Sequence, residues 1–115
     1  MKVRAPTRRP GLWTGDADND ARFETIARLL RAVADDCRLR LLAELGEGEL
    51  TVTEVAKRLS LPFMQTSAQL RVLWSQRLVK RRRSGSHVFY RRADGAGREV
   101  VDLLLAWMRG PTSTD

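Results

Sequence analysis

The sequence predicts a mainly α-helical domain with one small β-hairpin, an α+β fold class. Three observations lead to this prediction. Apolar residues recur at three- and four-residue spacing in several segments, as they do in amphipathic helices. Two of the shorter helical segments are separated by a three-residue turn at 60–62. Two strand-like runs, 78–83 and 87–92, are joined by a Ser-Gly-Ser sequence that suits a tight turn.

A length of 115 residues leaves room for one domain. Residues 1–18 mix proline, glycine and charge without periodicity, which indicates a flexible N-terminal arm. No apolar segment follows the positive N-terminus, so no secretory signal is expected. We expect residues 19–109 to form the folded domain and residues 110–115 to form a C-terminal tail. Trp13, within the arm, is either loosely held or contacts a partner.

Each of the first two predicted helices carries an apolar side. The first begins at residue 19 or 20 and ends at Ala34, and acidic residues at its start favour the helix N-terminus. Its apolar positions are Phe23, Ile26, Ala27, Leu30 and Val33. The second begins after residue 35 or 36 and ends at Gly46. Its apolar positions are Leu39, Leu41, Leu42 and Leu45.

A pair of helices joined by a short turn follows. Thr51 and Glu54 have the spacing of a capping box, which opens a short helix reaching Leu59. Pro62 suits the first position of the next helix, which is predicted to end near Gln76. The buried side of this second helix should consist of Thr66, Leu70 and Leu73.

The final predicted helix extends from Arg98 to Arg109, after a glycine-rich break at 95–97. It is apolar around most of its circumference, more than contact with one core requires. A domain of this size gains stability when a second copy covers such a surface. The sequence therefore favours self-association.

Charge is distributed unevenly along the chain. The net charge is +7, yet residues 10–54 hold ten acids against five Arg. Residues 55–93 contain ten Lys or Arg and no acid. Such segregation predicts one strongly positive surface and a polyanionic partner. The longest apolar run, 100–107, is too short to span a bilayer, so the prediction is nucleic acid and no membrane.

The second helix of the pair is predicted to enter the major groove of double-stranded DNA, because the short turn sets it across the first helix. Its outward side offers small and polar groups for base edges, and Gln can bond adenine at two atoms. The expected DNA contacts are Met64, Gln65, Ser67, Ala68, Gln69 and Arg71. The alternative is an ordinary solvated helix face.

The basic hairpin is predicted to grip the DNA backbone or an adjacent minor groove. The expected contacts are Arg81, Arg82, Arg83, His87 and Arg91. Val88 and Tyr90 should form the inward side of the hairpin and pack on the core. A solubilising edge strand is the alternative, since basic side chains also prevent edge pairing.

Six short segments resemble, in order, motifs of the ArsR/SmtB family of bacterial winged-helix repressors. They are LRAVAD at 30–35, RLRLL at 38–42, GELTVTEVA at 48–56, LRVL at 70–73, LVK at 78–80 and GSHVFY at 85–90. The resemblance spans residues 23–108. It implies a winged helix-turn-helix repressor that binds a two-fold symmetric operator as a homodimer. The implied interface lies on the first and last helices, at Phe23, Ile26, Leu30, Val101, Leu104, Leu105 and Met108.

The chain departs from this family at its metal-binding positions. Thr51 and Thr53 stand where many members have Cys-Val-Cys, and a hydroxyl cannot supply a thiolate. The last helix has Glu99 and Asp102 but no His. We therefore predict no metal site or cofactor. Weak binding of a divalent ion such as nickel or zinc remains an alternative, which would make the chain a metal-responsive regulator.

Cys37 is either a small buried side chain or a redox-responsive thiol at a helix start. A lone cysteine excludes an intrachain disulfide and fits a cytoplasmic location. The sequence offers no nucleophile–base pair, no phosphate-binding glycine loop and no paired carboxylates, so no enzymatic activity is predicted. The other functions left open are a dimeric protein-interaction module with non-specific nucleic-acid affinity and a general nucleic-acid binder. No effector is predicted.

Overall fold

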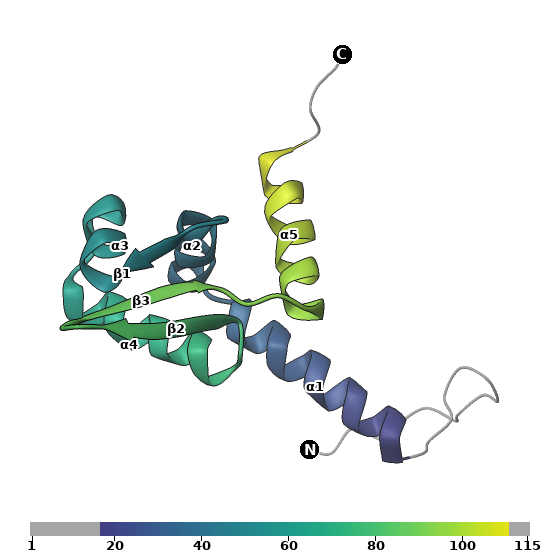
Figure 1. Ribbon diagram of the computed structural model, residues 1–115. Helices are drawn as coiled ribbons and strands as arrows, with labels where there is room; N and C mark the ends of the chain where they lie inside the picture. The colour runs from purple at the N-terminus through teal and green to yellow at the C-terminus, as the bar shows by residue number, and fades with distance from the viewer. Residues whose placement is uncertain (1–16, 111–115) are drawn as a thin grey trace.

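The computed structural model describes residues 17–110. In chain order its elements are α1 (Ala17–Val33), α2 (Asp36–Leu45), β1 (Glu49–Thr51), α3 (Val52–Leu59), α4 (Phe63–Ser75), β2 (Val79–Ser84), β3 (His87–Arg92) and α5 (Ala96–Arg109). Helices α2, α3 and α4 lie beside a small sheet, whereas α1 and α5 extend from the end opposite the β2–β3 turn (Figure 1). Trp13, most of the predicted arm and the tail from residue 111 lie outside the described residues.

Local signals explain where the helices begin. Asp35 precedes α2, and its carboxylate accepts a hydrogen bond from the backbone N–H of Arg38 at 3.0 Å. The predicted capping box is confirmed at α3, where the Glu54 carboxylate accepts from the Thr51 N–H at 2.8 Å and the Thr51 hydroxyl accepts from the Glu54 N–H at 3.2 Å. Pro62 immediately precedes α4 instead of occupying its first position, because its ψ of 141° is extended.

The sheet has one strand more than the predicted hairpin. Strand β1 has three residues and pairs antiparallel with β3, so the strand order is β1-β3-β2. The sequence pattern does not indicate this strand, because the strand lies directly between a glycine turn and the capping box. The hairpin itself is confirmed: Ser84 pairs with His87, and Gly85 has the positive φ of 62° that glycine adopts without penalty.

The core lies between the helix pair, α2 and the sheet. Its largest fully buried side chains are Leu41, Leu42, Leu70, Leu73, Val55, Val79, Val101 and Thr66. The predicted buried side of α4 is therefore confirmed. The Thr66 hydroxyl donates to the Pro62 carbonyl at 2.9 Å, so its polar group is satisfied inside the core. This packing fixes α4 with its opposite side facing solvent.

Helix α5 contributes to the same core through Val101 and Leu105, which are both buried. Their side chains pack within the chain, although the sequence had suggested them for an interface between two copies. The side chain of Arg92, at the end of β3, is also buried against this helix. Within residues 17–110, no helix combines the length and apolar character needed to cross a lipid bilayer.

Candidate nucleic-acid interface

Helix α4 presents an outer face to solvent that matches the predicted DNA contacts. The exposed members are Met64, Gln65, Ala68 and Arg71. The other two predicted contacts are half-buried at the edges of this face. Ser67 lines a hollow shared with β2 and β3, and Gln69 bonds to Arg38 of α2. All six predicted residues of α4 therefore lie on or beside one surface.

The edge of α4 nearest α2 is held by the first turn of that helix. Nη1 of Arg38 donates to Oε1 of Gln69 at 2.8 Å, and Nε2 of Gln65 makes a longer hydrogen bond of 3.9 Å to Sγ of Cys37. Cys37 is half-buried and packs against the core. Two consecutive residues of α2 thus contact two side chains predicted to read bases.

Strands β2 and β3 with their turn form the wing, and their register places its arginines on two faces. Arg81 lies opposite Tyr90 and Arg83 opposite Val88, so both arginines share the inward face of the wing. The guanidinium of Arg81 stacks 3.6 Å from the ring centroid of Trp74 in α4. This contact ties the wing to the C-terminal half of α4.

Arg82 and Arg91 lie on the outward face of the wing, and His87, which has the same register, lies at the start of β3, where it also lines the hollow between the wing and α3. Arg82 forms a bidentate ion pair with Glu49 of β1, with N···O distances of 2.8 to 3.1 Å. Hydrogen bonding to Arg82 lowers the pKa of Glu49, and the same bond raises the pKa of Arg82. Arg82 is therefore partly neutralised within the chain. The sequence did not indicate this pairing, because it did not indicate β1.

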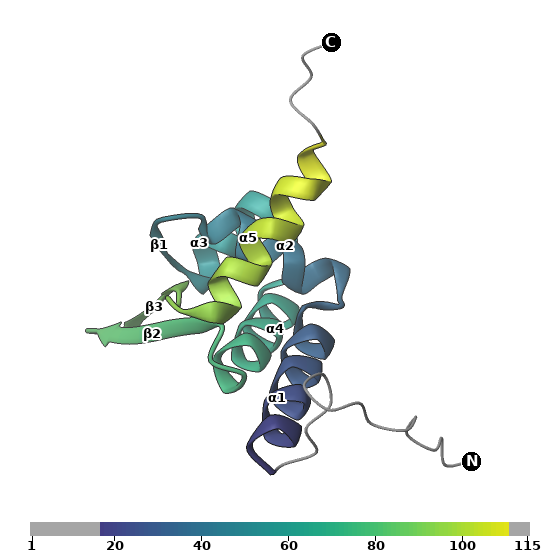
Figure 2. The same ribbon diagram turned by 90° about the vertical axis from the view of Figure 1, so that its right-hand side faces the viewer.

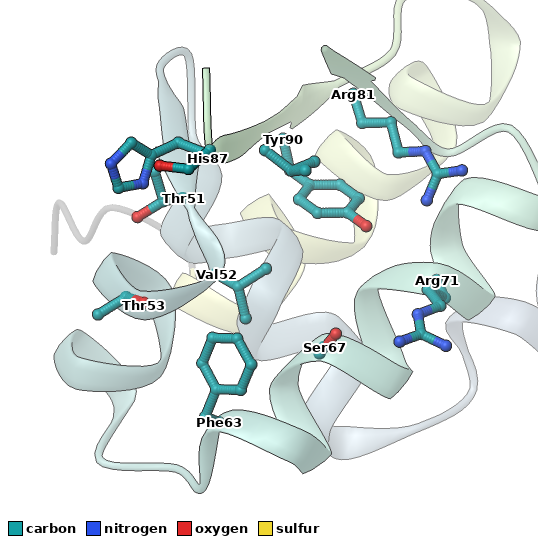
Figure 3. A pocket seen from close by; sticks show the side chains of 11 residues that line it. Thr51, Val52, Thr53, Phe63, Ser67, Arg71, Arg81, His87 and Tyr90 are labelled. Atoms are coloured by element: carbon teal, nitrogen blue, oxygen red, sulfur yellow. The ribbon is translucent and has the colours of Figure 1, made fainter. Parts of the chain in front are cut away.

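A hollow of about 310 Å³ separates the wing from α3 and α4 (Figure 3). It is lined by Thr51, Val52, Thr53, Phe63, Ser67, Arg71, Arg81, Ser86, His87, Val88 and Tyr90. Arg71 and Arg81 lie on one side of it, and His87 lies on the other with Thr51 and Thr53 (Figure 3). None of these described lining residues is acidic. The hollow thus combines positive charge with hydroxyl groups, a combination that suits phosphate oxygens.

Arg92 has a structural role that its place in the basic hairpin did not suggest. Its side chain is only 5% exposed, and Nη1 lies 2.7 Å from Oδ1 of Asp102 in α5. Nη2 also donates to the carbonyl of Arg98 at 3.4 Å. Arg98 in turn pairs with Glu47 and, at 3.3 Å, with Asp94. These ion pairs join the end of the wing to α5, so Arg92 is not available to DNA.

A second surface, formed by α1 and α5, is apolar. Both helices lie towards the viewer in Figure 2, in front of α2 and α4. Five of the residues proposed for an interface between copies are exposed here: Phe23, Ile26, Leu30, Leu104 and Met108. Leu103 and Trp107 are exposed as well, at 72% and 82%. The interface expected from the sequence did not include these two, although both belong to the apolar circumference of the last helix.

Two acidic side chains in and beside α5, the helix for which weak metal binding was an alternative, are engaged in ion pairs. Asp94 and Asp102 form ion pairs with Arg98 and Arg92. Within the part of the chain that the structure describes, no group of three or more His, Cys, Asp or Glu side chains could hold a metal ion.

No family model matches the chain. A transcriptional repressor SmtB homolog from Synechocystis sp. is 42% identical over 85 residues, which make up 70% of this chain and 64% of that protein. The biofilm growth-associated repressor of Agrobacterium fabrum is 32% identical over 92 residues, 80% of this chain and 79% of that protein. The alignment therefore spans less than two thirds of the first relative and more than two thirds of the second.

Solved structures agree with these relatives. The homodimeric winged helix-turn-helix DNA-binding domain of a possible ArsR-family transcriptional regulator from Mycobacterium bovis matches with a TM-score of 0.74. Its sequence is 28% identical, and the match covers 85% of this chain and 91% of that one. Together with α4 and the wing, this match defines a winged helix-turn-helix transcriptional regulator. The chain belongs to the ArsR/SmtB family, as its sequence motifs indicated. Its relatives are regulators, not enzymes, which agrees with the expectation from the sequence.

Proposed function

We propose that the chain is a homodimeric transcriptional repressor that binds a two-fold symmetric operator in double-stranded DNA. The observation that carries this proposal is the position of Arg71 and Arg81 in a hollow without acidic lining, beside the exposed outer face of α4. A duplex needs these two features together, positive charge for its backbone and an accessible helix for its base edges. Both relatives are named repressors, which supports repression as the effect on transcription.

In this proposal the two elements have different tasks. Gln65, Ser67 and Arg71 contact base edges, whereas Met64 and Ala68 offer apolar contact to thymine methyl groups. Residues of the wing, Arg81, Arg83, His87 and Arg91, contact phosphates. Arg82 contributes less than its neighbours because Glu49 already binds it. Base contacts provide selectivity, and phosphate contacts provide affinity that falls as salt rises.

The apolar surface of α1 and α5 is the proposed contact between two copies. A second copy would cover exposed side chains such as Phe23, Ile26 and Met108, which a single chain leaves in water. The homodimeric state of the Mycobacterium bovis domain supports this assignment. A two-fold pair presents two α4 helices, which fits an inverted repeat whose half-sites are about 34 Å, one turn of DNA, or a multiple of it apart.

Selection of genomic DNA fragments by the purified protein tests this function. We expect recovery of one inverted-repeat motif, bound with an affinity that falls steeply with salt. Recovery of unrelated fragments with equal affinity would instead support a general nucleic-acid binder or a protein-interaction module. The matched control is Lys57→Ala, which removes an exposed positive charge from α3 outside the hollow and should leave the recovered motif unchanged. DNA in the cytoplasm is the proposed target, and the effector is unassigned.

A further inference from the structure

We propose that Arg38 of α2 determines base specificity by positioning Gln69. It holds the Gln69 amide with its nitrogen outward, so that Gln69 reads a hydrogen-bond acceptor on a base edge. This inference rests on the proposed function and specifies the chemistry recognised at one position of the operator. The juxtaposition that carries it is the 2.8 Å contact between Nη1 of Arg38 and Oε1 of Gln69.

The chemistry of arginine sets the orientation of the amide. A guanidinium has five N–H donors and no acceptor, so only the oxygen of Gln69 can bond to it. The reverse orientation would place two donors against each other and lose the bond. The Nε2 group of Gln69 must therefore point away from Arg38.

The nitrogen of Gln69 is open to solvent. Gln69 is half-buried, and within residues 17–110 its Nε2 makes no hydrogen bond. In the same part of the chain, no buried side-chain nitrogen or oxygen lacks a partner. An unbonded Nε2 must consequently reach the surface. Neither of its hydrogens has a partner within these residues, so the group can donate to a ligand at this edge of α4.

Arg38 is itself fixed from two neighbouring segments. Its Nε donates to the carbonyl oxygen of Ala32, near the end of α1, at 2.5 Å. Its backbone N–H is bonded to Asp35, and its Nη1 lies 3.9 Å from the second oxygen of that carboxylate. The Arg38 side chain is only 17% exposed. The guanidinium therefore provides a rigid anchor for the Gln69 amide.

This orientation changes which bases Gln69 can recognise. A bidentate contact to adenine requires the amide to accept from N6 and donate to N7. Arg38 binds one lone pair of the Gln69 oxygen and holds that oxygen towards α2, so the side chain presents its donors to a ligand on the other side. Guanine, whose N7 and O6 are both acceptors, fits this amide best, whereas thymine and adenine each offer a single acceptor, O4 and N7. We expect guanine opposite Gln69.

Substitution at each base pair of the selected operator, measured by fluorescence anisotropy, provides the test. Gln69→Ala should lower discrimination about tenfold at one base pair per half-site, and this loss identifies the base that Gln69 reads. Gln69→Glu keeps an acceptor for Arg38 but removes the donors. Its preference at that position should shift from guanine to a base that donates, cytosine or adenine. Gln65→Glu is the matched control and should leave that position unchanged.

Arg38→Leu frees the amide to rotate, so adenine should become acceptable at the same position. Circular dichroism checks that this variant folds. If Arg38→Leu does not fold, the Gln69→Glu variant alone tests the inference. The inference is overturned if Gln69→Ala changes no base preference, if wild type prefers adenine there, or if Gln69→Glu retains the wild-type preference. Failure of the wild type to select any motif would instead contradict the proposed function.

Discussion

The two ends of the molecule differ in how far their side chains find partners within a single chain. At the end formed by α4 and the wing, several charged side chains already have partners, such as Arg82 with Glu49 and Arg81 with Trp74. At the end formed by α1 and α5, apolar side chains such as Trp107 remain in water. The first surface is preformed for a charged ligand, whereas the second requires another protein surface. DNA contact and self-association therefore depend on separate residues.

The two ends are also physically joined. The buried Arg92 of β3 and Asp102 of α5 form an ion pair between the wing and the helix that carries the apolar surface. A change in the position of α5 on assembly would therefore act on the base of the wing. Substitutions at the two ends and at this junction distinguish the contributions of DNA contact, self-association and the ion pair that joins them.

The largest effect is expected from a charge placed in the apolar surface. Leu104→Glu would bury a carboxylate between two copies, which should raise the dimer dissociation constant about 100-fold or more. Analytical ultracentrifugation measures this change. Ala106→Glu adds the same charge to an exposed position two residues later, on another side of α5, and serves as the control. Equal dissociation constants for wild type and Leu104→Glu would exclude this surface from the dimer.

A smaller effect is expected at the junction. Asp102→Asn leaves the buried Arg92 without its ionic partner and should lower the free energy of unfolding by about 2 kcal/mol. The value is below that of a fully enclosed pair because the Asp102 side chain is half exposed. Urea unfolding at a fixed protein concentration measures it. Arg40→Gln, which breaks an exposed pair with Asp36, should change stability by less than about 0.5 kcal/mol. Similar losses in both variants would argue against a structural role for Arg92.

Two neighbouring arginines of the wing should differ in their contribution to DNA affinity. Arg83→Ala removes a cation with no ion-pair partner in the described residues, so binding should weaken several-fold and the salt slope should fall by about 0.9, one phosphate contact. Arg82→Ala should have a smaller effect on both, because Glu49 already neutralises part of its charge. Anisotropy titrations over a range of salt concentrations distinguish the two. A larger loss in Arg82→Ala would show that its pairing with Glu49 does not reduce its contact with the backbone.

The smallest effect is expected on the stability of the fold at acid pH. The pKa of Glu49 is lowered by its bond to Arg82, so this pair stabilises the fold above the ordinary carboxyl pKa. The contribution is lost as the pH falls through the lowered value. Glu49→Gln should therefore make thermal stability less dependent on pH on the acid side of the ordinary carboxyl pKa. Arg82→Gln should produce the same change, and the double variant should add nothing further. Unchanged pH dependence in both single variants would mean that the pair contributes nothing to stability.

Much of the fold follows from local patterns in the sequence. Apolar spacing predicted the helices, and the Thr51–Glu54 capping box fixed the start of α3. The Ser-Gly-Ser turn located the hairpin, because Gly85 supplies the positive φ that it needs. These signals lie within a few residues of the features they specify. The local structures that they favour are kept in the folded chain because tertiary packing favours the same structures.

The functional surface was less predictable because its details depend on contacts between distant segments. The outward position of α4 followed from the three buried residues on its other side. The engagement of Gln69 by Arg38 did not, since the two residues are 31 positions apart. The same reason hid the pairing of Arg82 with Glu49 and the burial of Arg92. A basic side chain in a basic segment can be a ligand-binding group or a structural one, and only its neighbours decide.

Binding of the selected inverted repeat and of its isolated half-site, measured with stoichiometry by sedimentation, tests the dimeric regulator most directly. We expect one dimer per inverted repeat and at least about 100-fold weaker binding to the half-site, because both α4 helices must contribute to the full affinity. Leu104→Glu should remove most of this difference. Equal affinity for the full site and the half-site, with one chain bound to each, would contradict a dimeric regulator.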